Sequence, residues 1–208
     1  MKLYYDETIA PQKVCALAKY LGSPVEYVHV DLGKGHNRKP AYAALNPNCK
    51  VPTLVDGERT LWEADAIMAY LARAAGSDLW PSDDRQFDVL RWLSWNNQHF
   101  TFHAGTIYFE HRIKRLLLQM DPDTAEVAEA MKYFNRFAGV LNEHLRGRKY
   151  LLGDTLTIAD FAVGVTLPYA AEIRLPVQDF PEIERWHARL NELPAWREPF
   201  PAVKSAAA

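Results

Sequence analysis

Residues 46–71, NPNCKVPTLVDGERTLWEADAIMAYL, decide the fold of this chain. Within them, Val51-Pro52-Thr53 lies between an approach rich in proline and asparagine and an apolar strand. A cis prolyl bond at this point can turn the chain and leave the main-chain N–H and C=O of Val51 to a ligand. A helix is predicted from Glu63 onward, and a helix start offers unpaired N–H groups and partial positive charge to a carboxylate. The stretch therefore predicts a clamp for a small acidic peptide.

The residues before this stretch predict a strand, a helix and a second strand. Residues 1–5 alternate as a strand does, residues 11–21 place their apolar positions on one helical face, and residues 25–30 are rich in β-branched side chains. Such a unit implies two parallel strands with a right-handed crossover. Asp56-Gly57 then favours a hairpin. The order βαβ followed by ββα predicts a thioredoxin-like α/β domain.

The rest of the chain predicts an all-helical domain. The polar stretch at residues 77–83 is a linker in this interpretation, between a domain at residues 1–76 and a helical domain at residues 84–208. A long helical segment is expected from residue 83 to residue 118. The next helix should begin at Asp121-Pro122, with Asp121 as its cap.

A further helix start is predicted at Thr157. Thr157 and Asp160 have the spacing of a capping box, which predicts a buried helix from Thr157 to about Ala171. Asp160 is therefore interpreted as a capping residue and not as a catalytic acid.

The composition of the chain restricts the kinds of partner and the cellular compartment that the protein is expected to have. The chain has 208 residues, 49% of them hydrophobic, so it can bury a substantial core. A net charge of -2 gives no electrostatic argument for binding nucleic acid or an anionic membrane. Cys15 and Cys49 lack the spacing of a disulfide framework or a metal site, and neither a signal peptide nor an apolar run of the ~20 residues that span a bilayer is evident. These features predict a cytoplasmic protein without a metal.

Two ordered signatures, one within residues 46–71 and one formed by residues 156–161 with residues 181–190, resemble the cytosolic glutathione transferases, of the serine/theta-like or bacterial type. The first resembles their glutathione-binding half, and the second resembles the helix start and closing helix of their all-helical domain. The likeness covers nearly the whole chain and implies an α/β thioredoxin-like domain followed by an all-α domain. Its residues are Asn46-Pro47, Val51-Pro52-Thr53-Leu54, Leu61-Trp62-Glu63, Ala66-Ile67 and Tyr70-Leu71 in the first half, then Leu156 to Phe161 and Pro181 to Trp186 with Leu190.

The resemblance implies a residue that favours the thiolate of glutathione, since only the anion is a competent nucleophile. In the family this donor follows the first strand. Matching Lys13-Val14 to the family's first helix places Thr8 at the donor position, whereas matching on Pro11 places Ala10 there. Ala10 has no donor side chain, so the second match leaves the role to a backbone N–H or to Tyr5. Thr8 is the first candidate and Tyr5 the second.

The same resemblance assigns the contacts with glutathione. Lys50 would approach the carboxylate at the glycine end of glutathione. The main chain of Val51 would hydrogen-bond to the main chain of the cysteinyl residue, and Glu63 would bind the γ-glutamyl end. Ala64 stands where the family usually has serine, and losing that hydrogen bond would cost about 1.5 to 3 kcal/mol. The expected glutathione-binding residues are Lys39, Lys50, Val51, Pro52, Glu63 and Ala64.

Aromatic and histidine residues concentrate between Trp92 and His111. His99 and His103 lie one helical turn apart, and a third residue with metal-ligand spacing is not evident, so this pair does not predict a metal site. The resemblance implies that His99, His103 and Tyr108 line a pocket for an apolar electrophile. Helix packing is the alternative.

These observations predict a homodimeric glutathione transferase active in detoxification. It would add the glutathione thiolate to a small hydrophobic electrophile, or use glutathione to reduce a peroxide, with glutathione as co-substrate and no other cofactor. Two alternatives remain. One is a transferase-like protein-interaction module without catalysis, which Ala64 motivates, and the other is a glutathione-dependent lyase or isomerase.

Overall fold

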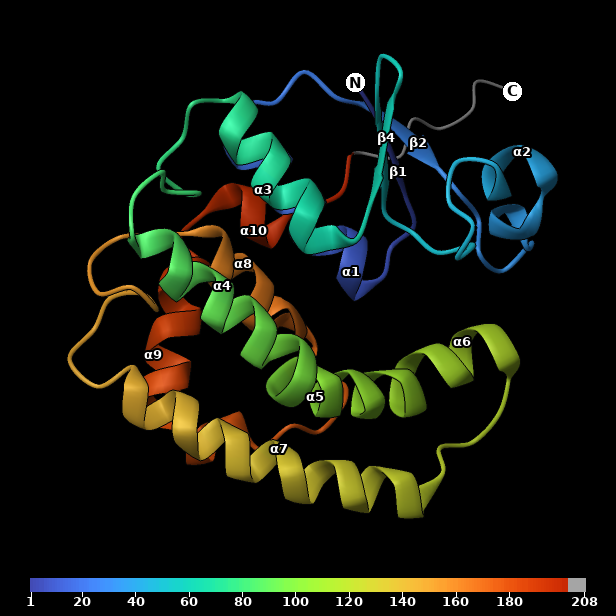
Figure 1. Ribbon diagram of the computed structural model, residues 1–208. Coiled ribbons are helices and arrows are strands. Elements are labelled where there is room, and N and C mark those ends of the chain that lie inside the picture. The colour runs from blue at the N-terminus through green and yellow to red at the C-terminus, as the bar shows by residue number, and fades with distance from the viewer. Residues whose placement is uncertain (202–208) are drawn as a thin grey trace. The chain divides into compact units, whose positions relative to one another are not determined.

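The computed structural model describes residues 1–201 as two compact units, which are treated separately below (Figure 1). The first unit comprises Met1–Ala75 and residues 192–201, and the second comprises Gly76–Asn191. Among the described residues, no helix combines the length and the apolar character needed to cross a bilayer.

The first unit is built on a four-stranded sheet with the order β2-β1-β3-β4. Strands β1 and β2 are parallel, and β3 is antiparallel to both β1 and β4. This topology confirms the predicted thioredoxin-like arrangement. Its elements are β1 (Lys2–Tyr5), α1 (Ile9–Tyr20), β2 (Glu26–His29), a 3₁₀ turn (His36–Arg38), α2 (Pro40–Ala43), β3 (Thr53–Asp56), β4 (Arg59–Trp62), α3 (Ala64–Ala74) and α10 (Pro194–Arg197).

Alternation along β1 sends side chains to two faces of the sheet. Leu3 and Tyr5 are buried on one face, where α1 and α3 pack against each other. Tyr4 belongs to the other face, where it packs with Tyr42 of α2 and with Val51. The crossover helix α1 and helix α3 therefore cover one face of the sheet, and Tyr42 of α2 packs on the other.

The end of the chain returns to the first unit. Helix α10 packs against α1, and its Trp196 is buried. The Phe200 ring stacks on Tyr5 with centroids 5.9 Å apart, and Lys19 Nζ donates to the Glu198 carbonyl at 2.6 Å. The predicted boundary of the helical domain at residues 84–208 differs from the structure, because residues 192–201 belong to the first unit.

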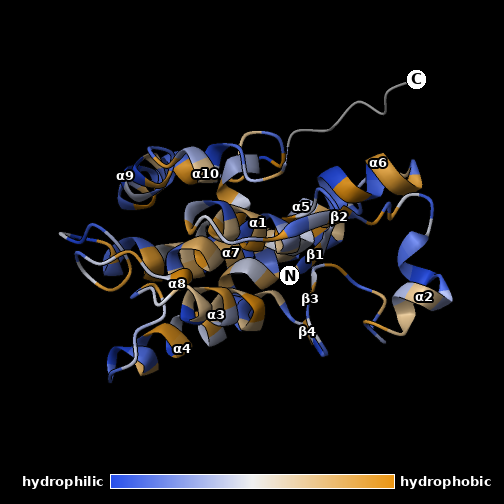
Figure 2. Ribbon diagram, turned by 90° about the horizontal axis from the view of Figure 1, so that it is seen from above, coloured by the Kyte–Doolittle hydropathy of each residue, from blue (hydrophilic) through white to orange (hydrophobic). Residues whose placement is uncertain are grey.

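The second unit is helical. Its predicted helix over residues 83–118 forms with two π-helical interruptions. Its elements are α4 (Arg85–Trp95), a π segment (Asn96–Phe100), α5 (Thr101–Tyr108), a π segment (Phe109–Ile113), α6 (Lys114–Leu118), α7 (Thr124–His144), α8 (Ile158–Val163), 3₁₀ segments (Gly164–Tyr169 and Val177–Asp179) and α9 (Pro181–Leu190). Hydrophobic and hydrophilic residues mix along these helices (Figure 2).

Two predicted helix boundaries were wrong. Asp123, not Asp121, caps α7, because its carboxylate accepts from the amides of Ala125 and Glu126 at 2.9 and 3.2 Å. Helix α8 ends at Val163, short of the expected Ala171, and continues as a 3₁₀ segment. That segment contains Pro168, which has no N–H to donate and disfavours a regular α-helix.

The predicted capping box is present at the start of α8, and Asp160 is its centre. The buried Asp160 carboxylate accepts from the amides of Leu151 and Thr157 at 2.9 Å and from Trp186 Nε1 at 3.0 Å. Burial raises the pKa of Asp160 to about 6, and these hydrogen bonds oppose the rise. One carboxylate therefore joins a loop, a helix start and α9.

We expect Asp160→Ala to lower the free energy of unfolding by on the order of 3 kcal/mol or more, because it leaves buried donors unsatisfied. Denaturant unfolding measures the change. Asp154→Ala is the matched control: the Asp154 side chain is 82% exposed, and its ion pair with Lys149 contributes less than about 1 kcal/mol. Equal effects of the two variants would contradict the structural role of Asp160.

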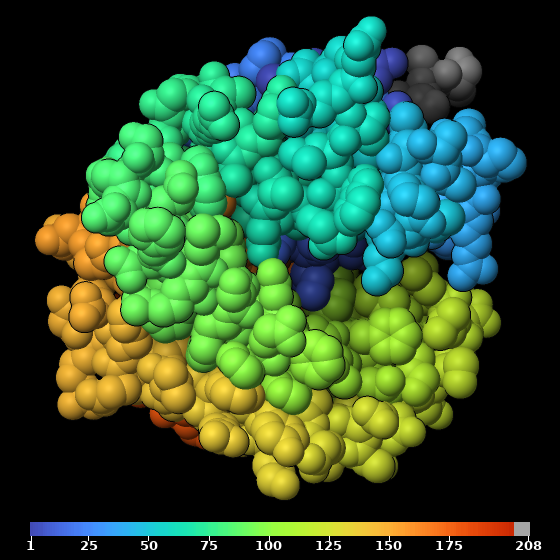
Figure 3. Space-filling view, in the orientation of Figure 1, coloured from blue at the N-terminus to red at the C-terminus, as the bar shows by residue number. Residues whose placement is uncertain are grey.

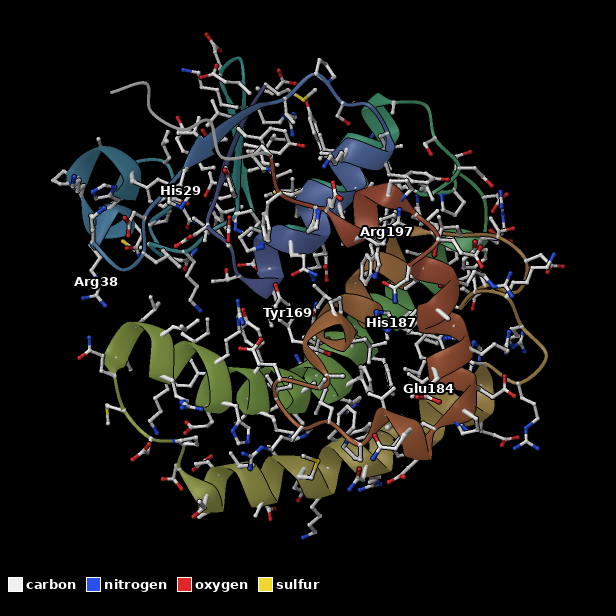
Figure 4. The ribbon with its side chains drawn as sticks, turned by 180° about the vertical axis from the view of Figure 1, so that it is seen from behind. His29, Arg38, Tyr169, Glu184, His187 and Arg197 are labelled. Atoms are coloured by element: carbon white, nitrogen blue, oxygen red, sulfur yellow. The ribbon has the colours of Figure 1, made fainter. Side chains whose placement is uncertain are left out.

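His187 on α9 gives the stability a pH dependence (Figure 4). Burial lowers the pKa of His187 to about 4, so the folded state holds the imidazole neutral. The free energy of unfolding that depends on the neutral His187 imidazole is fully present above the pKa of about 6.5 in the unfolded chain. It is lost as the pH falls from there to about 4. Between pH 7 and pH 4.5 we expect wild type to lose about 2 kcal/mol of unfolding free energy relative to His187→Gln.

Urea unfolding of wild type and His187→Gln across this pH range tests the expectation. The difference between the proteins is the informative quantity, because Asp160 titrates in both and acts in the opposite sense: its raised pKa favours the folded state as the pH falls. Parallel pH profiles would show that His187 does not carry the effect.

Candidate functional site

The register of the sheet brings three chain segments to one end of the first unit. Tyr4 near the end of β1 pairs with Thr53 at the start of β3, and Thr53 pairs with Trp62 at the end of β4. The loop after β1, the turn before β3 and the turn after β4 therefore leave the sheet at the same end. These segments hold most of the residues that the sequence assigned to glutathione.

Thr8 occupies the N-cap position of α1. Its backbone is extended, with φ -126° and ψ 166°, and its side chain makes no capping hydrogen bond. Its carbonyl accepts from the Gln12 amide at 3.0 Å, which starts the helix. A half-buried hydroxyl is thus uncommitted beside the positive end of α1.

Asp6 fixes the loop that carries Thr8. Its carboxylate accepts from the amides of Leu32 and Glu7 at 2.9 and 2.8 Å and contacts Nε2 of His29 at 3.1 Å. The loop is thereby joined to the chain after β2. Sequence reasoning missed this residue, although an aspartate directly after a strand is a common turn signal.

Tyr5 points to the opposite side of the strand from Tyr4, into the face covered by α1. It is 8% exposed, and its ring contacts Tyr27, His29 and Phe200 at centroid distances of 5.9, 5.6 and 5.9 Å. Burial raises the pKa of Tyr5, and the nearby Cys15 adds to the rise. Its ring is held within the protein core.

A buried polar network shapes the proline turn. The Val51–Pro52 peptide bond is cis. The Lys50 carbonyl accepts from the Tyr42 hydroxyl at 2.6 Å and from Asn46 Nδ2 at 2.8 Å, and both groups also contact Thr53 Oγ1, at 2.9 and 3.1 Å. In the part of the chain that the structure describes, no group donates to the Val51 carbonyl or accepts from its amide.

The turn after β4 ends in a strained residue. Glu63 is the N-cap of α3 and has φ 72° and ψ 117°, a region that costs a non-glycine residue about 1–3 kcal/mol. Its side chain makes no capping bond and is exposed. Ala64 follows as a buried residue, and the first amides of α3 have no intrahelical acceptor. The start of α3 therefore directs main-chain N–H groups and the positive end of the helix dipole toward this end of the sheet.

A buried ion pair joins the starts of α1 and α3. Lys13 Nζ lies 2.5 Å from Asp65 Oδ1, and the two side chains are 7% and 17% exposed. Sequence reasoning placed Lys13 at the start of the first helix but did not find its partner, which lies 52 residues away. The pair fixes the two helix starts relative to each other within the unit.

Lys39 and Lys50 lie on the surface of the first unit. Lys39 is the N-cap of α2, and Lys50 precedes the proline turn. Within residues 1–201, neither ammonium group forms an ion pair. Both are available to an anion, although Lys50 is fixed only through its carbonyl.

The expected electrophile-pocket residues belong to the second unit and form two groups. His99 and His103 stack on rings of α7: His99 on Phe137 at 4.6 Å, and His103 on Tyr133 at 4.8 Å. Tyr108 is instead buried against Tyr169 at 5.0 Å. Figure 3 shows the light-green segment containing α5 at the surface. Among the described residues, no group of three or more His, Cys, Asp or Glu side chains could hold a metal ion.

Comparison with known proteins identifies the family. The model of the glutathione S-transferase N-terminal domain matches residues 2–73, and that of the C-terminal domain matches residues 102–194. The chain belongs to the glutathione S-transferase family. Membership confirms the resemblance, the fold class and the enzyme class inferred from the sequence.

Named relatives agree with this assignment. The chain is 32% identical to glutathione S-transferase 3 of Zea mays, over 96% of this chain and 93% of the relative. It is 29% identical to glutathione S-transferase D6 of Drosophila melanogaster, over 93% and 88%. A glutathione transferase from Burkholderia graminis, solved with two glutathione molecules per subunit, is 27% identical with a TM-score of 0.83, over 98% and 88% of the two chains.

Proposed function

We propose that this glutathione S-transferase activates glutathione with Thr8 and adds its thiolate to a hydrophobic electrophile. The observation that carries the proposal is the convergence of three features at one end of the sheet: the Thr8 hydroxyl, which makes no capping bond, the Val51 main chain and the start of α3. Together they offer a donor for sulfur, a main-chain partner for a peptide and a site for a carboxylate.

Activation of the thiol would come from hydrogen bonding and helix polarity. A hydroxyl that donates to the thiolate favours the anion, and the positive end of α1 acts in the same direction. Thr8 is preferred over Tyr5 because its hydroxyl is uncommitted at the N-cap, whereas the Tyr5 ring is enclosed by Tyr27, His29 and Phe200. The thiolate then forms a C–S bond to the reactive carbon of the electrophile. In a substitution the leaving group departs with the bonding electron pair, and in an addition to an activated double bond the neighbouring carbon takes up a proton from water.

Binding of the peptide would use the other two segments. The amide and carbonyl of Val51 would pair with the cysteinyl main chain, and Glu63 with the amide of Ala64 would hold the γ-glutamyl end. Lys50 and Lys39 would attract the glycine carboxylate. This proposal also takes the enzyme to be a cytoplasmic homodimer, as the family resemblance implies, with Tyr108 and the two stacked histidines as candidates on the electrophile side.

We expect Thr8→Val to lower kcat/KM with glutathione and an aryl halide by about tenfold to a hundredfold, since a hydrogen bond to a charged group contributes about 1.5–3 kcal/mol. The pKa of enzyme-bound glutathione should rise in parallel, as followed by the ultraviolet absorbance of its thiolate. Thr8→Ser keeps the hydroxyl and should retain most activity.

Tyr5→Phe serves as the second control and should leave the pKa of bound glutathione unchanged. An unaltered rate and thiolate titration in Thr8→Val would reject Thr8 as the donor. Absence of conjugation by the wild-type enzyme at millimolar glutathione would reject the transferase function itself.

Ala64→Ser should restore the missing contact with the γ-glutamyl carboxylate and lower the Kd for glutathione about tenfold. Isothermal titration calorimetry measures the change. Ala66→Ser, at an exposed position of the same helix, is the matched control and should bind glutathione as wild type does. If Ala64→Ser binds no more tightly than Ala66→Ser, the carboxylate does not lie at the start of α3.

A further inference from the structure

The loop between β1 and α1 carries Thr8 and has little support of its own. Tyr5 ends β1 and Ile9 begins α1, so the loop consists of Asp6, Glu7 and Thr8. The Thr8 amide donates to the Asp6 carbonyl at 2.7 Å, which closes a tight turn. Within residues 1–201, neither the Glu7 nor the Thr8 side chain forms a hydrogen bond. The support of the loop therefore depends on the Asp6 side chain.

The Asp6 carboxylate anchors this loop on the chain after β2. One oxygen accepts from the Leu32 amide at 2.9 Å. The other accepts from the Glu7 amide at 2.8 Å and contacts Nε2 of His29 at 3.1 Å. His29 ends β2 and is labelled in Figure 4. The Asp6 side chain is 19% exposed, and hydrogen bonds to a carboxylate that is shielded from water are stronger than those in solvent.

Leu32 connects this anchor with the proline turn. Its side chain packs against the buried cluster of Val30, Tyr42 and Val51. Val51 is the residue whose main chain is proposed to pair with the cysteinyl part of glutathione. The Thr8 loop and the proline turn are therefore both held to Leu32, the first through its amide and the second through its side chain.

The charge of Asp6 opposes thiol activation. A carboxylate close to a thiol disfavours the thiolate. The same effect acts on Tyr5, whose pKa is raised mainly by burial, with smaller increases from Cys15, Glu7 and Asp6. A negative charge directly before α1 is thus unfavourable for a thiolate at the start of that helix. Anchoring is the compensating gain, because a carboxylate can accept several hydrogen bonds at once.

We propose that Asp6 is a positioning residue for thiol activation, which sets the place of Thr8 relative to Val51 through the Leu32 amide. A glutathione molecule paired with Val51 carries its sulfur a fixed number of bonds from that main chain. The Thr8 hydroxyl then reaches the sulfur only if the two segments keep their spacing, and a displacement of about 1 Å can lower a rate on the order of a hundredfold. This inference rests on the proposed function, because Thr8 is the group that Asp6 positions.

A double-mutant cycle with Thr8→Val tests whether Asp6 acts through Thr8. In the wild-type background, Asp6→Ala should lower kcat about tenfold with glutathione and an aryl halide. The pKa of bound glutathione should rise, as followed by the absorbance of its thiolate. In the Thr8→Val background, Asp6→Ala should leave kcat unchanged or raise it slightly, because only the opposing charge is then removed.

Binding of S-methylglutathione separates positioning from loss of the fold. This probe has no thiol to ionise, and its contacts with Val51 and the start of α3 do not involve Asp6. Its Kd in Asp6→Ala, measured by isothermal titration calorimetry, should stay within about twofold of wild type. If Asp6→Ala does not bind the probe, the same cycle is run with Asp6→Asn and judged by the same two criteria, kcat and the pKa of bound glutathione.

Two further variants separate the anchor from the charge. The Asp31 carboxylate accepts from the Lys34 amide at 2.9 Å and pairs with Lys34 Nζ at 2.9 Å, within the loop after β2. Asp31→Ala removes an equal charge without releasing the Thr8 loop, so kcat and the pKa of bound glutathione should not change. Asp6→Asn keeps an oxygen for the Leu32 amide and should retain more activity than Asp6→Ala.

Equal losses from Asp6→Ala in the wild-type and Thr8→Val backgrounds would overturn the proposal, since Asp6 would then act independently of Thr8. A lowered pKa of bound glutathione in Asp6→Ala would also overturn it, because the charge would then outweigh the anchor. A loss in Asp31→Ala as large as that in Asp6→Ala would reduce the effect to net charge.

Failure of the proposed function gives a different result. A wild-type rate in Thr8→Val defeats the proposed donor, and the role of Asp6 with it. A lowered rate in Thr8→Val together with a wild-type rate in Asp6→Ala defeats only the positioning role of Asp6.

Discussion

Pairing of β1 along both of its edges is the constraint on which the proposed glutathione site depends. Strand β1 pairs with the parallel strand β2 along one edge and with the antiparallel strand β3 along the other. Strand β3 in turn pairs with the antiparallel strand β4. The direction of each strand then determines which loops share an end of the sheet. Thr8, Val51 and Glu63 are distant in sequence, and they share one end only because of these pairings. A register shift in β3 would separate them.

Each element of the site has its own support. The Asp6 carboxylate fixes the loop with Thr8, the Tyr42, Asn46 and Thr53 network fixes the proline turn, and the Lys13–Asp65 pair fixes the starts of two helices. None of these supporting groups belongs to the residues expected to touch glutathione. Such preorganisation matters for catalysis, because groups already in position do not reorganise as charge develops on sulfur.

The sequence was sufficient for the fold because its signals are local. Periodicity located β1 and α1, Asp56-Gly57 marked the hairpin, and the spacing of Thr157 and Asp160 marked a capping box. Long-range contacts were not accessible in this way. The ion pair of Lys13 with Asp65 depends on how α1 packs against α3, and no local pattern encodes that packing.

The wrong prediction for the start of α7 also results from contacts that no local pattern encodes. Asp121 and Asp123 are both suitable caps by residue type, and only the path of the chain selects Asp123. The aromatic stretch near His99 was also ambiguous, since stacking on α7 and lining a pocket require the same kinds of side chain. The positive φ of Glu63 has no local sequence signal either, because positive φ is typical of glycine and the residue type here gives no hint of it.

The return of the chain end to α1 bears on the order of events during synthesis. Residues 1–75 leave the ribosome long before Trp196, yet Trp196 and Phe200 cover α1 and Tyr5. Until the last segment emerges, the nascent first domain exposes apolar surface that the finished protein hides. The helical domain must therefore be translated before the first unit is complete, and the apolar surface of α1 stays exposed to water during that interval.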